Sequence, residues 1–575
     1  MKRFLIYFCF FVFLFSFVFR SLIFSISTNL VDWRDYAFVT WLINRNLDKI
    51  INLNLSGFSS LNIFYPNTNT LFFSETLLTQ SLLGLPAHFL TTNPIIVFNS
   101  VFILTFLLNY LSLYLFWGKV FKNSFLSFTG SLLFIFSPYF FLEIGHFQML
   151  SYWPFFFSLY FLGRSFNENR KVWSIFSGIF AGLQFLSSTY LAIFLMFTLL
   201  LYSFIEFIFE KNKFETVKKY LLVIISFALI SGVFVKGYFN TKKQYSMTRN
   251  PNEFIQYSAH VSDYLFTTPI ESVIHKSWVM NIWNHFDKNT MGGKAAFPGF
   301  VVTILAIVSI FIVKVSKKNI FFSLNFDKQG IFFFLLLSLG MIFSWGPRIN
   351  FNGNYAHIPS LYYVLLKTIP FLEAARAPAR WSFLFYFGII YFALTTINKI
   401  LRSRYAKYII FLISITFFLE YIPTNFITHK ENFVSSQYEI IEHFCNKSPA
   451  TLLEIPITHF DGNGGIMMGL NRVVKYELSS LSHKCNLING YSGYDLPSLI
   501  AFKDNFYQAL NEKSPKDIIK FLNKNKVDLV KINRDSLSKE DLANYLYIYP
   551  VLIKEKNIQA IDEDLWLVNL SLKPQ

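Results

Sequence analysis

The sequence contains few charged residues for its length. Only 15% of its 575 residues are Asp, Glu, Lys or Arg, whereas 53% are hydrophobic and the mean hydropathy is +0.41. A typical soluble domain has about 25% charged residues. The composition therefore argues against a soluble globular protein and indicates a chain that crosses a membrane several times.

Cysteine is also scarce. The chain has only Cys9, Cys445 and Cys485, which excludes a fold held by many disulfides and offers no spacing typical of zinc ligands. Cys445 and Cys485 lie in the same carboxy-terminal segment. They can form a single disulfide or remain two separate thiols, and the sequence leaves both alternatives open.

The net charge is +17, from 51 basic and 34 acidic residues, and by itself is compatible with nucleic-acid binding. The position of the charge argues otherwise. Residues 424–575 contain 17 basic and 18 acidic residues, which leaves 34 basic and 16 acidic residues for the apolar part. Because the excess lies between hydrophobic runs, we expect contact with membrane lipids and no nucleic-acid partner.

Long apolar runs predict a polytopic α-helical membrane protein. The first run, residues 4–26, lacks the small-residue cleavage site of a signal peptide, so we expect it to be retained as a helix. A further segment, residues 76–90, is apolar but short and broken by Gly84 and Pro86, which suits a helix at the interface or a re-entrant segment. In total we expect about eleven spans, namely 4–26, 94–117, 124–142, 150–163, 172–188, 190–209, 219–237, 298–313, 331–345, 381–398 and 408–423.

Basic residues between the spans predict the orientation. The amino terminus and the even-numbered connections carry 19 Lys and Arg residues, whereas the short connections at 143–149 and 187–190 carry none. By the positive-inside rule, the amino terminus is inside. The larger outer pieces are then residues 27–93, 238–297, 346–380 and 424–575.

The carboxy-terminal segment differs in kind from the rest. Its near-neutral charge and alternating patterns predict a membrane domain at 1–423 followed by an outer, soluble α/β domain at 424–575. Ser514 and Ser538 are each followed three residues later by an acid, which marks two helix starts. Strand-length apolar stretches lie at 450–455, 527–532 and 565–570.

Few ionisable residues fall inside the spans, which disfavours an ion-coupled transporter. Polar groups gather instead in the outer pieces, beginning with Asp32 and Asp35. At i and i+3 these two acids share one helix face and suit a carboxylate pair or metal ligands. Alternatively, they are acids that stabilise a helix amino terminus.

Three further groups have two interpretations each. His146 is either a hydrogen-bonded anchor at the membrane boundary or a ligand. The charged residues of the second large outer piece are solvated or part of a site; they are Arg249, Glu253, His260 and Asp263. Arg376 and Arg380 directly precede a span, where guanidinium groups bind lipid phosphate bidentately or extend to the interface.

Several motifs together resemble bacterial membrane proteins of the GT-C superfamily, in particular the YfhO-like group with an outer carboxy-terminal domain. The resemblance covers nearly the whole chain. In addition to Asp35, it rests on FYPNTNTLFFSE (64–75), SPYFFLEIGHFQMLSYWPFFF (137–157), GLQFLSSTYLAIF (182–194), PFLEAARAPARW (370–381) and LINGYSGYDLP (487–497).

This resemblance implies a glycosyltransferase of the bacterial cytoplasmic membrane that uses a polyprenyl-phosphate sugar. Asp35, with Asp32 beside it, is then the catalytic base, and transfer to a glycan, teichoic-acid or glycolipid acceptor inverts the anomeric carbon. Arg376, Arg380 and Arg249 are expected to bind the donor phosphate. Substrate contacts are expected from Tyr65, Glu75, Glu143, His146, Gln148, Tyr190 and Tyr491.

Some features of the resemblance leave alternatives open. Mannosyl-transferring members carry adjacent Asp and Glu in the first outer loop, whereas Trp33 and Arg34 separate the two acids in this sequence. A Mg or Mn ion held by Asp35 with Glu143 or His146 is compatible with the chemistry, but no spacing demands one. Tyr491 and Asp495 contact the acceptor or belong to a Gly-rich turn. A lipid-linked glycan flippase or exporter and a non-catalytic envelope scaffold are the alternative functions.

Overall fold

The computed structural model forms two compact units. The first consists of Met1–Phe24, Phe102–Phe234 and Thr248–Ile427, and the second of Ser25–Val101, Val235–Met247 and Thr428–Gln575. The described residues are 2–32, 35–53, 57–210, 212–265, 272–274, 276, 296–315, 327–351, 354–356, 359–431, 438–447, 449–457, 466–494, 496–552, 554, 558–561 and 564–568. The second unit thus combines the carboxy-terminal segment with two segments from the first half of the chain.

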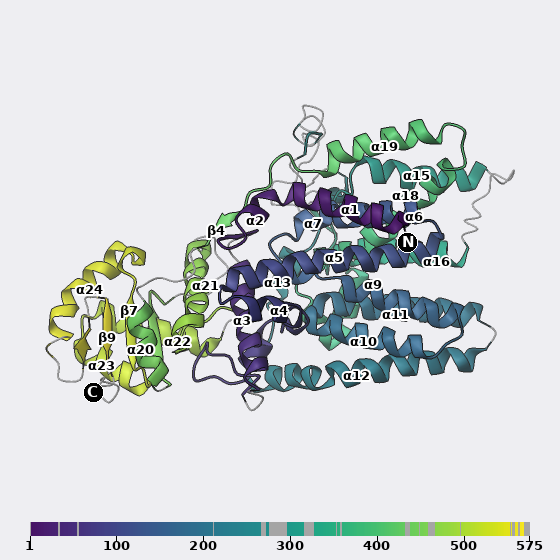
Figure 1. Ribbon diagram of the computed structural model, residues 1–575. Coiled ribbons are helices and arrows are strands. Elements are labelled where there is room, and N and C mark those ends of the chain that lie inside the picture. Colours follow the sequence, from purple (N-terminus) through teal and green to yellow (C-terminus); the bar gives the residue numbers. More distant parts are fainter. Residues whose placement is uncertain are drawn as a thin grey trace. The chain divides into compact units, whose positions relative to one another are not determined.

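The first unit is almost entirely helical (Figure 1). It holds most of α5 (Pro94–Phe121) and of α12 (Lys213–Gln244). Its other longer elements are α1 (Lys2–Val18), α2 (Arg20–Phe24), α6 (Ser124–Ile135), α7 (Pro138–Leu142), α9 (Trp153–Asn167), α10 (Val172–Ser187), α11 (Thr189–Phe209), α15 (Phe300–Val315), α16 (Lys328–Ser344), α17 (Leu361–Thr368), α18 (Ser382–Ile400) and α19 (Ala406–Tyr421). Each predicted span overlaps at least one of these helices.

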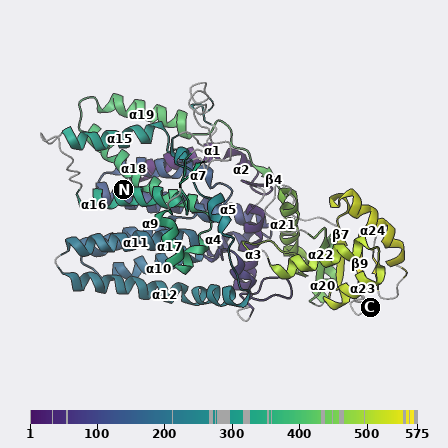
Figure 2. The same ribbon diagram turned by 180° about the vertical axis from the view of Figure 1, so that it is seen from behind.

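Short elements connect the long helices. They are α8 (Phe147–Leu150), α13 (Pro251–Gln256), η2 (Val261–Tyr264), the hairpin of β2 (Asn350–Phe351) and β3 (Asn354–Tyr355), η3 (Pro370–Ala374) and η4 (Pro378–Trp381). Among the long helices, α10 packs against α9 and α11, and two of its glycines contact α12. Figures 1 and 2 accordingly show α10 between α11 and α12 from both sides.

The helices confirm an integral membrane protein. Within the described part of the chain, five helical segments are long and apolar enough to cross a membrane; they are Pro94–Phe121, Ser124–Leu142, Thr189–Phe209, Lys213–Gln244 and Pro378–Ile400. Three shorter helices are similarly apolar. The total of eleven spans stays a prediction.

Helix α18 lies at the centre of the first unit. It packs against α6, α15, α16 and α19, and nearly all of its residues are buried. A helix that is apolar on every side belongs in such an environment. Its close approach to α16 depends on glycine, because a Cβ atom on Gly340 would lie 2.2 Å from the backbone nitrogen of Phe385.

Aromatic side chains fill the space around α18. The rings of Phe333 and Tyr391 stack with their centroids 4.0 Å apart, and Phe387 meets Phe156 edge to face at 5.0 Å. Offset-stacked and edge-to-face pairs are the favoured arrangements of aromatic rings. A substantial part of the packed interior of the helical unit therefore consists of Phe side chains.

The second unit combines helices with a sheet. Its amino-terminal elements are β1 (Asn29–Leu30), α3 (Asp35–Ile51), η1 (Thr70–Phe73) and α4 (Leu78–Leu90). The carboxy-terminal segment adds β4 (His429–Lys430), α20 (Glu439–Lys447), β5 (Thr451–Ile455), α21 (Ile466–His483), β6 (Asn486–Leu487), α22 (Pro497–Asn511), α23 (Pro515–Lys524), β7 (Leu529–Ile532), η6 (Arg534–Ser536), α24 (Lys539–Leu552), β8 (Gln559–Ala560) and β9 (Leu565–Leu567).

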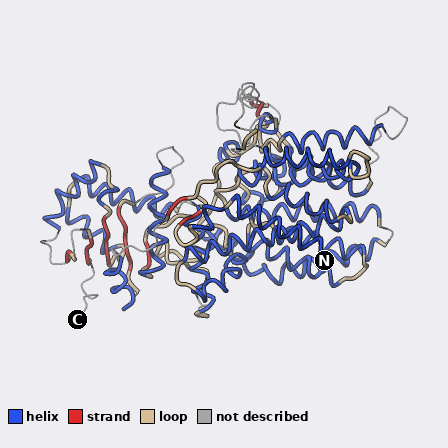
Figure 3. The backbone as a smooth tube through the Cα atoms, turned by 45° about the horizontal axis from the view of Figure 1, so that its top comes forward, coloured by secondary structure: helices blue, strands red, loops and turns tan. Residues whose placement is uncertain are grey.

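Five strands form one mixed sheet, in the order β6-β5-β7-β9-β8 (Figure 3). Strands β6, β5 and β7 are parallel, whereas β9 is antiparallel to β7 and to β8. The predicted strands at 450–455, 527–532 and 565–570 correspond to β5, β7 and β9. The predicted helix starts are also confirmed, because the side chains of Ser514 and Ser538 accept hydrogen bonds from the backbone of Asp517 and Asp541.

Two details of the second unit answer questions left by the sequence. Cys445 and Cys485 form a disulfide, with their Cα atoms 5.2 Å apart. Helix α4 continues through both Gly84 and Pro86, so the expected break in this segment is wrong. A Cβ atom on Gly84 would lie 3.1 Å from Leu47 Cδ1, and the glycine therefore permits close packing of α4 on α3.

A buried polar network lies within the sheet. Glu454 of β5 and Lys531 of β7 are partners in the strand register, and their charged groups are 3.9 Å apart. The hydroxyl group of Tyr438 donates to the Glu454 carboxylate at 3.0 Å, and the Lys531 ammonium lies 3.5 Å from the Tyr438 ring centroid. Each buried charge thus has polar or aromatic neighbours, as burial of a charge requires.

His483 stacks on Tyr438 of this network, and its buried position predicts that the stability depends on pH. Its ring is fully buried, 5.3 Å from the Tyr438 ring, and Nδ1 accepts the backbone N–H of Cys485. Burial, and then the positive charge of Lys531, lower the pKa of His483 to about 3. The unfolded chain takes up this proton near pH 6.5, so stability is present above that pH and is lost as the pH falls toward 3.

We therefore expect the second unit to lose about 2 kcal/mol of stability between pH 7 and pH 5 through this histidine alone. His483→Asn should flatten that part of the pH dependence. Unfolding of the full chain in detergent, followed at both pH values, measures the effect. The exposed His443 in the same segment provides the control, and equal pH dependence of wild type and His483→Asn would contradict the assignment.

Candidate functional site

Arg380 and Glu143 form a charge pair in the first unit. Arg380 lies in η4, directly before the buried helix α18, and Glu143 directly follows α7. The Arg380 Nε and Glu143 Oε2 atoms are 3.1 Å apart, and the two side chains are only 12% and 6% exposed. The guanidinium Cζ lies 4.6 Å from the ring centroid of Tyr190. The positive charge of Arg380 is therefore stabilised by the Glu143 carboxylate and by the face of the Tyr190 ring.

His146 contacts the same carboxylate. Its Nδ1 atom lies 3.3 Å from Glu143 Oε2, and its side chain is 41% exposed. Since His146 and Arg380 approach the same oxygen, the Glu143 carboxylate orients both groups. We refer to Glu143, His146, Tyr190, Arg376 and Arg380 as the guanidinium cluster.

Arg376 enters the cluster from the connection between η3 and η4. Its Nη1 atom lies 3.7 Å from Glu253 Oε2, and its Cζ atom lies 5.6 Å from the ring centroid of Tyr257. Burial and the positive charge of Arg380 lower the pKa of Arg376, whereas Tyr190, Tyr257 and Glu253 raise it, and the net effect is an increase. A guanidinium has five N–H donors, so a single carboxylate contact does not exhaust its capacity to bind an oxyanion.

A second group of predicted site residues lies in the other unit, at the start of α3. Tyr491 donates a hydrogen bond from its hydroxyl group to Asp35 Oδ1 at 3.1 Å, although 456 positions separate the two residues. The Tyr491 ring meets Phe38 edge to face at 5.5 Å. Its backbone N–H donates to Glu477 Oε1 at 2.6 Å. Tyr491 is therefore fixed from three sides, and it orients the Asp35 carboxylate.

Several ionisable side chains lie around Asp35. Burial raises the pKa of the Tyr36 hydroxyl, and the charges of Asp32 and Asp35 add to this effect. Burial likewise raises the pKa of Glu477 well above its usual value. Asp32 and Asp35 are both half-buried. Among the described residues, this group includes Asp32, Asp35 and Glu477, with Tyr36 and Tyr491 beside them, whereas Trp33, Arg34 and Asp495 lie outside the described residues.

The remaining predicted residues are divided between the units. Tyr65 belongs to the second unit, where its backbone N–H donates to Leu487 O at 2.9 Å beside β6. Glu75, also in the second unit, is half-buried. Gln148 lies in α8 and Arg249 in the connection between α12 and α13, both in the first unit.

The structure also corrects one expectation and adds residues. Of the two interpretations of Asp263, solvation is excluded, because this side chain is fully buried and its Oδ2 accepts the backbone N–H of His260 at 2.8 Å. Tyr257 and Glu477 were not predicted as site residues. In the sequence, Tyr257 is an aromatic residue in a charged connection, and Glu477 is one of several charged residues in the segment of α21, so neither stands out.

The metal hypothesis gains no support from the side chains. Across the described residues, no group of three or more His, Cys, Asp or Glu side chains is placed to hold a metal ion. Of the residues considered as ligands, Glu143 and His146 belong to the first unit and Asp35 to the second. We therefore assign no step to a metal.

The arrangement of helices has a counterpart among solved structures. The chain is similar to the arabinofuranosyltransferase AftD from Mycobacteria, with a TM-score of 0.51 and 9% sequence identity over 85% of this chain. It spans 36% of the length of that protein. The likeness shows that this chain shares its fold with the matched part of that protein.

A family match is more specific to this sequence. Residues 8–419 match the family described as a domain of unknown function (DUF6311), and the chain belongs to this family. No curated protein matches the sequence. Membership of the YfhO-like group stays a prediction.

The archaeal oligosaccharyltransferase AglB from Archaeoglobus fulgidus is a weaker structural neighbour. Two of its structures match with TM-scores of 0.43 and 0.45 and identities of 11% and 10%. They cover 94% of this chain and 71% and 70% of theirs.

The pair of Arg380 and Glu143 predicts a strong energetic coupling. Removing one partner of a buried ion pair leaves the other charge buried, which typically costs about 3–5 kcal/mol. We expect Arg380→Gln and Glu143→Gln each to destabilise the full chain in mixed micelles, and the double variant to cost less than their sum. The exposed pair of Arg164 and Glu168 is the control, since Glu168→Gln should have little effect. Additive effects of the two buried substitutions would show that the pair is not coupled.

Proposed function

We propose that the protein is a glycosyltransferase that moves a hexosyl group from a polyprenyl-phosphate donor to an acceptor on the outer face of a bacterial cytoplasmic membrane. The acceptor is a glycan, a teichoic acid or a glycolipid. The observation that carries the proposal is the guanidinium cluster at the start of the buried helix α18. The fold shared with AftD supports it.

In this proposal the guanidinium cluster binds the phosphate of the donor. A prenyl phosphate is an anion at the membrane surface, and guanidinium groups match the geometry of its oxygens. Arg376 and Arg380 supply the positive charge, and Glu143 fixes the orientation of Arg380. Because donors oriented in advance need no reorganisation, they stabilise the negative charge that develops on the leaving group.

Asp35 is the proposed base. It accepts the proton of an acceptor hydroxyl group as the acceptor oxygen attacks the anomeric carbon of the sugar. A new C–O bond forms, the bond from the anomeric carbon to the phosphate oxygen breaks, and prenyl phosphate leaves with the bonding electrons. Attack from the opposite face inverts the configuration. Tyr491 is a positioning residue, since it donates to one oxygen of Asp35.

The disulfide and the charge distribution support an outer location for the carboxy-terminal segment. Disulfides persist in oxidising compartments and are rare in the cytosol. The pair of Cys445 and Cys485 therefore favours exposure outside the cytoplasm. This agrees with the orientation expected from the basic residues of the connections.

The base predicts a specific loss of activity. We expect Asp35→Asn to reduce transfer by about 10²–10⁴-fold, because the asparagine amide cannot take up the proton of the acceptor hydroxyl group as a base. The assay uses proteoliposomes with undecaprenyl-phosphate-linked glucose, mannose and arabinose and measures released undecaprenyl phosphate. Tyr491→Phe should reduce the rate less than Asp35→Asn.

Asp48→Asn on the same helix is the matched control and should retain activity, since Asp48 pairs with His88 at 3.7 Å instead. All variants must insert and form the disulfide of the wild type. Undiminished transfer by Asp35→Asn would remove the proposed mechanism. Movement of the intact lipid-linked sugar across the bilayer without bond cleavage would favour the flippase, and neither activity would favour the scaffold.

A further inference from the structure

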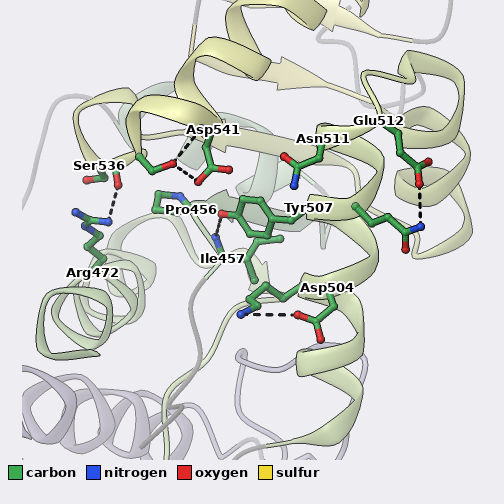
Figure 4. A pocket seen from close by; sticks show the side chains of 12 residues that line it. Pro456, Ile457, Arg472, Asp504, Tyr507, Asn511, Glu512, Ser536 and Asp541 are labelled. Atoms are coloured by element: carbon green, nitrogen blue, oxygen red, sulfur yellow. Dashed lines mark hydrogen bonds and ion pairs between the residues drawn. The ribbon is translucent and has the colours of Figure 1, made fainter. Parts of the chain in front are cut away.

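The carboxy-terminal segment contains an open cleft of about 900 Å³ that the proposed transfer reaction does not use (Figure 4). Pro456 and Ile457 of its lining directly follow β5, and Ser536 and Ser538 follow β7. The opposite wall comes from α22. The cleft thus lies outside the carboxyl ends of two adjacent parallel strands.

The order of the strands places this cleft where the connections that leave two adjacent strands run in opposite directions. From β5 the chain proceeds through α21 to β6, the neighbour on one side of β5. From β7 it proceeds through α24 to β8, which lies on the side of β7 away from β5. The connections that leave β5 and β7 therefore diverge and open a crevice between them. In open α/β sheets, ligands bind in such crevices at the point where the strand order reverses.

Polar groups in the cleft are held in place by one another. The hydroxyl group of Tyr507 accepts the backbone N–H of Ile457 at 3.1 Å, and Arg472 Nη1 donates to Ser536 O at 2.5 Å. Ser538 Oγ donates to Asp541 Oδ2 at 2.7 Å. In Figure 4, Tyr507 lies in the middle of the lining side chains.

Opposite charges act on Tyr507 from within the cleft. Burial is the largest cause of its raised pKa, with Asp541 adding to the increase and Arg472 opposing it. The Arg472 guanidinium and the Asp541 carboxylate both line the same cleft as this hydroxyl group. A ligand hydroxyl placed beside Tyr507 finds both a donor and an acceptor there.

The balance of charge indicates the class of ligand. The lining has two cations, Arg472 and Lys503, and three acids, Asp504, Glu512 and Asp541. The carboxylates would repel a phosphate-bearing ligand, and the cations would repel a cationic ligand. The lining also has two amide side chains, Gln508 and Asn511, and an amide both donates and accepts hydrogen bonds. This mixture suits a neutral ligand with many hydroxyl groups.

We propose that this cleft is a carbohydrate-binding site for a neutral oligosaccharide. Its volume lies in the upper part of the range of about 300–1,000 Å³ for small-molecule sites, so it accommodates more than one sugar ring. The proposal does not depend on the transferase reaction, because binding in the cleft requires no bond cleavage.

Titration calorimetry of the full chain in nanodiscs tests the proposal. The probes are maltotriose, mannotriose, galactotriose and arabinotriose, with inorganic phosphate and ADP as charged alternatives. We expect at least one trisaccharide to bind and the charged probes not to compete. Asp504→Ala and Tyr507→Phe should each weaken that binding by about tenfold, because each removes a polar contact to the ligand.

Glu540→Ala is the matched control, since this exposed acid adjoins Asp541 but does not line the cleft. The Asp35→Asn variant should bind the sugar as the wild type does, which separates this proposal from the transferase. An intact disulfide and an unchanged melting temperature show that each variant is folded. Failure of the wild type to bind any of the four sugars, or equal binding by the Asp504 and Tyr507 variants, would overturn the assignment, as would preferred binding of phosphate or ADP.

Discussion

A guanidinium that is nearly excluded from water requires a fixed anionic partner, and this constraint shapes the first unit. Arg380 meets it through Glu143 and the face of Tyr190. Its neighbour Trp381 is fully buried, with Phe194 at 4.4 Å and Phe343 at 5.0 Å between ring centroids. The aromatic packing around α18 therefore holds the charge pair rigidly at the end of the helix. A rigid cation is what recognition of an oxyanion requires.

Sequence patterns predicted those features that depend on local interactions. The apolar runs became helices, because each can bury its side chains in lipid or against neighbours. The caps at Ser514 and Ser538 were predictable since the capping groups lie within one helical turn. By contrast, the bond between Tyr491 and Asp35 joins residues 456 positions apart, and the pairing of Cys445 with Cys485 depends on α20 packing beside β6. No local pattern specifies such contacts. The buried pair of Glu454 and Lys531 left only a weak signal, a single charge within each of two apolar strands.

The two proposed binding regions differ in their charge balance, and this difference assigns them different ligands. The guanidinium cluster presents Arg376 and Arg380 beside aromatic faces, which suits an anionic lipid head group. The cleft in the carboxy-terminal segment alternates cations, acids and amides, which suits hydroxyl groups. In both places, neighbouring residues fix the polar side chains before a ligand arrives. This arrangement reduces the conformational cost of binding.

The most direct test of the central claim is the affinity of the full chain for undecaprenyl phosphate compared with undecaprenol, measured by native mass spectrometry from nanodiscs. If Arg376 and Arg380 bind the phosphate, the wild type should prefer the phosphate by at least about tenfold, and Arg376→Gln should reduce this preference. Equal affinity of the wild type for the phosphate and the alcohol would contradict the account.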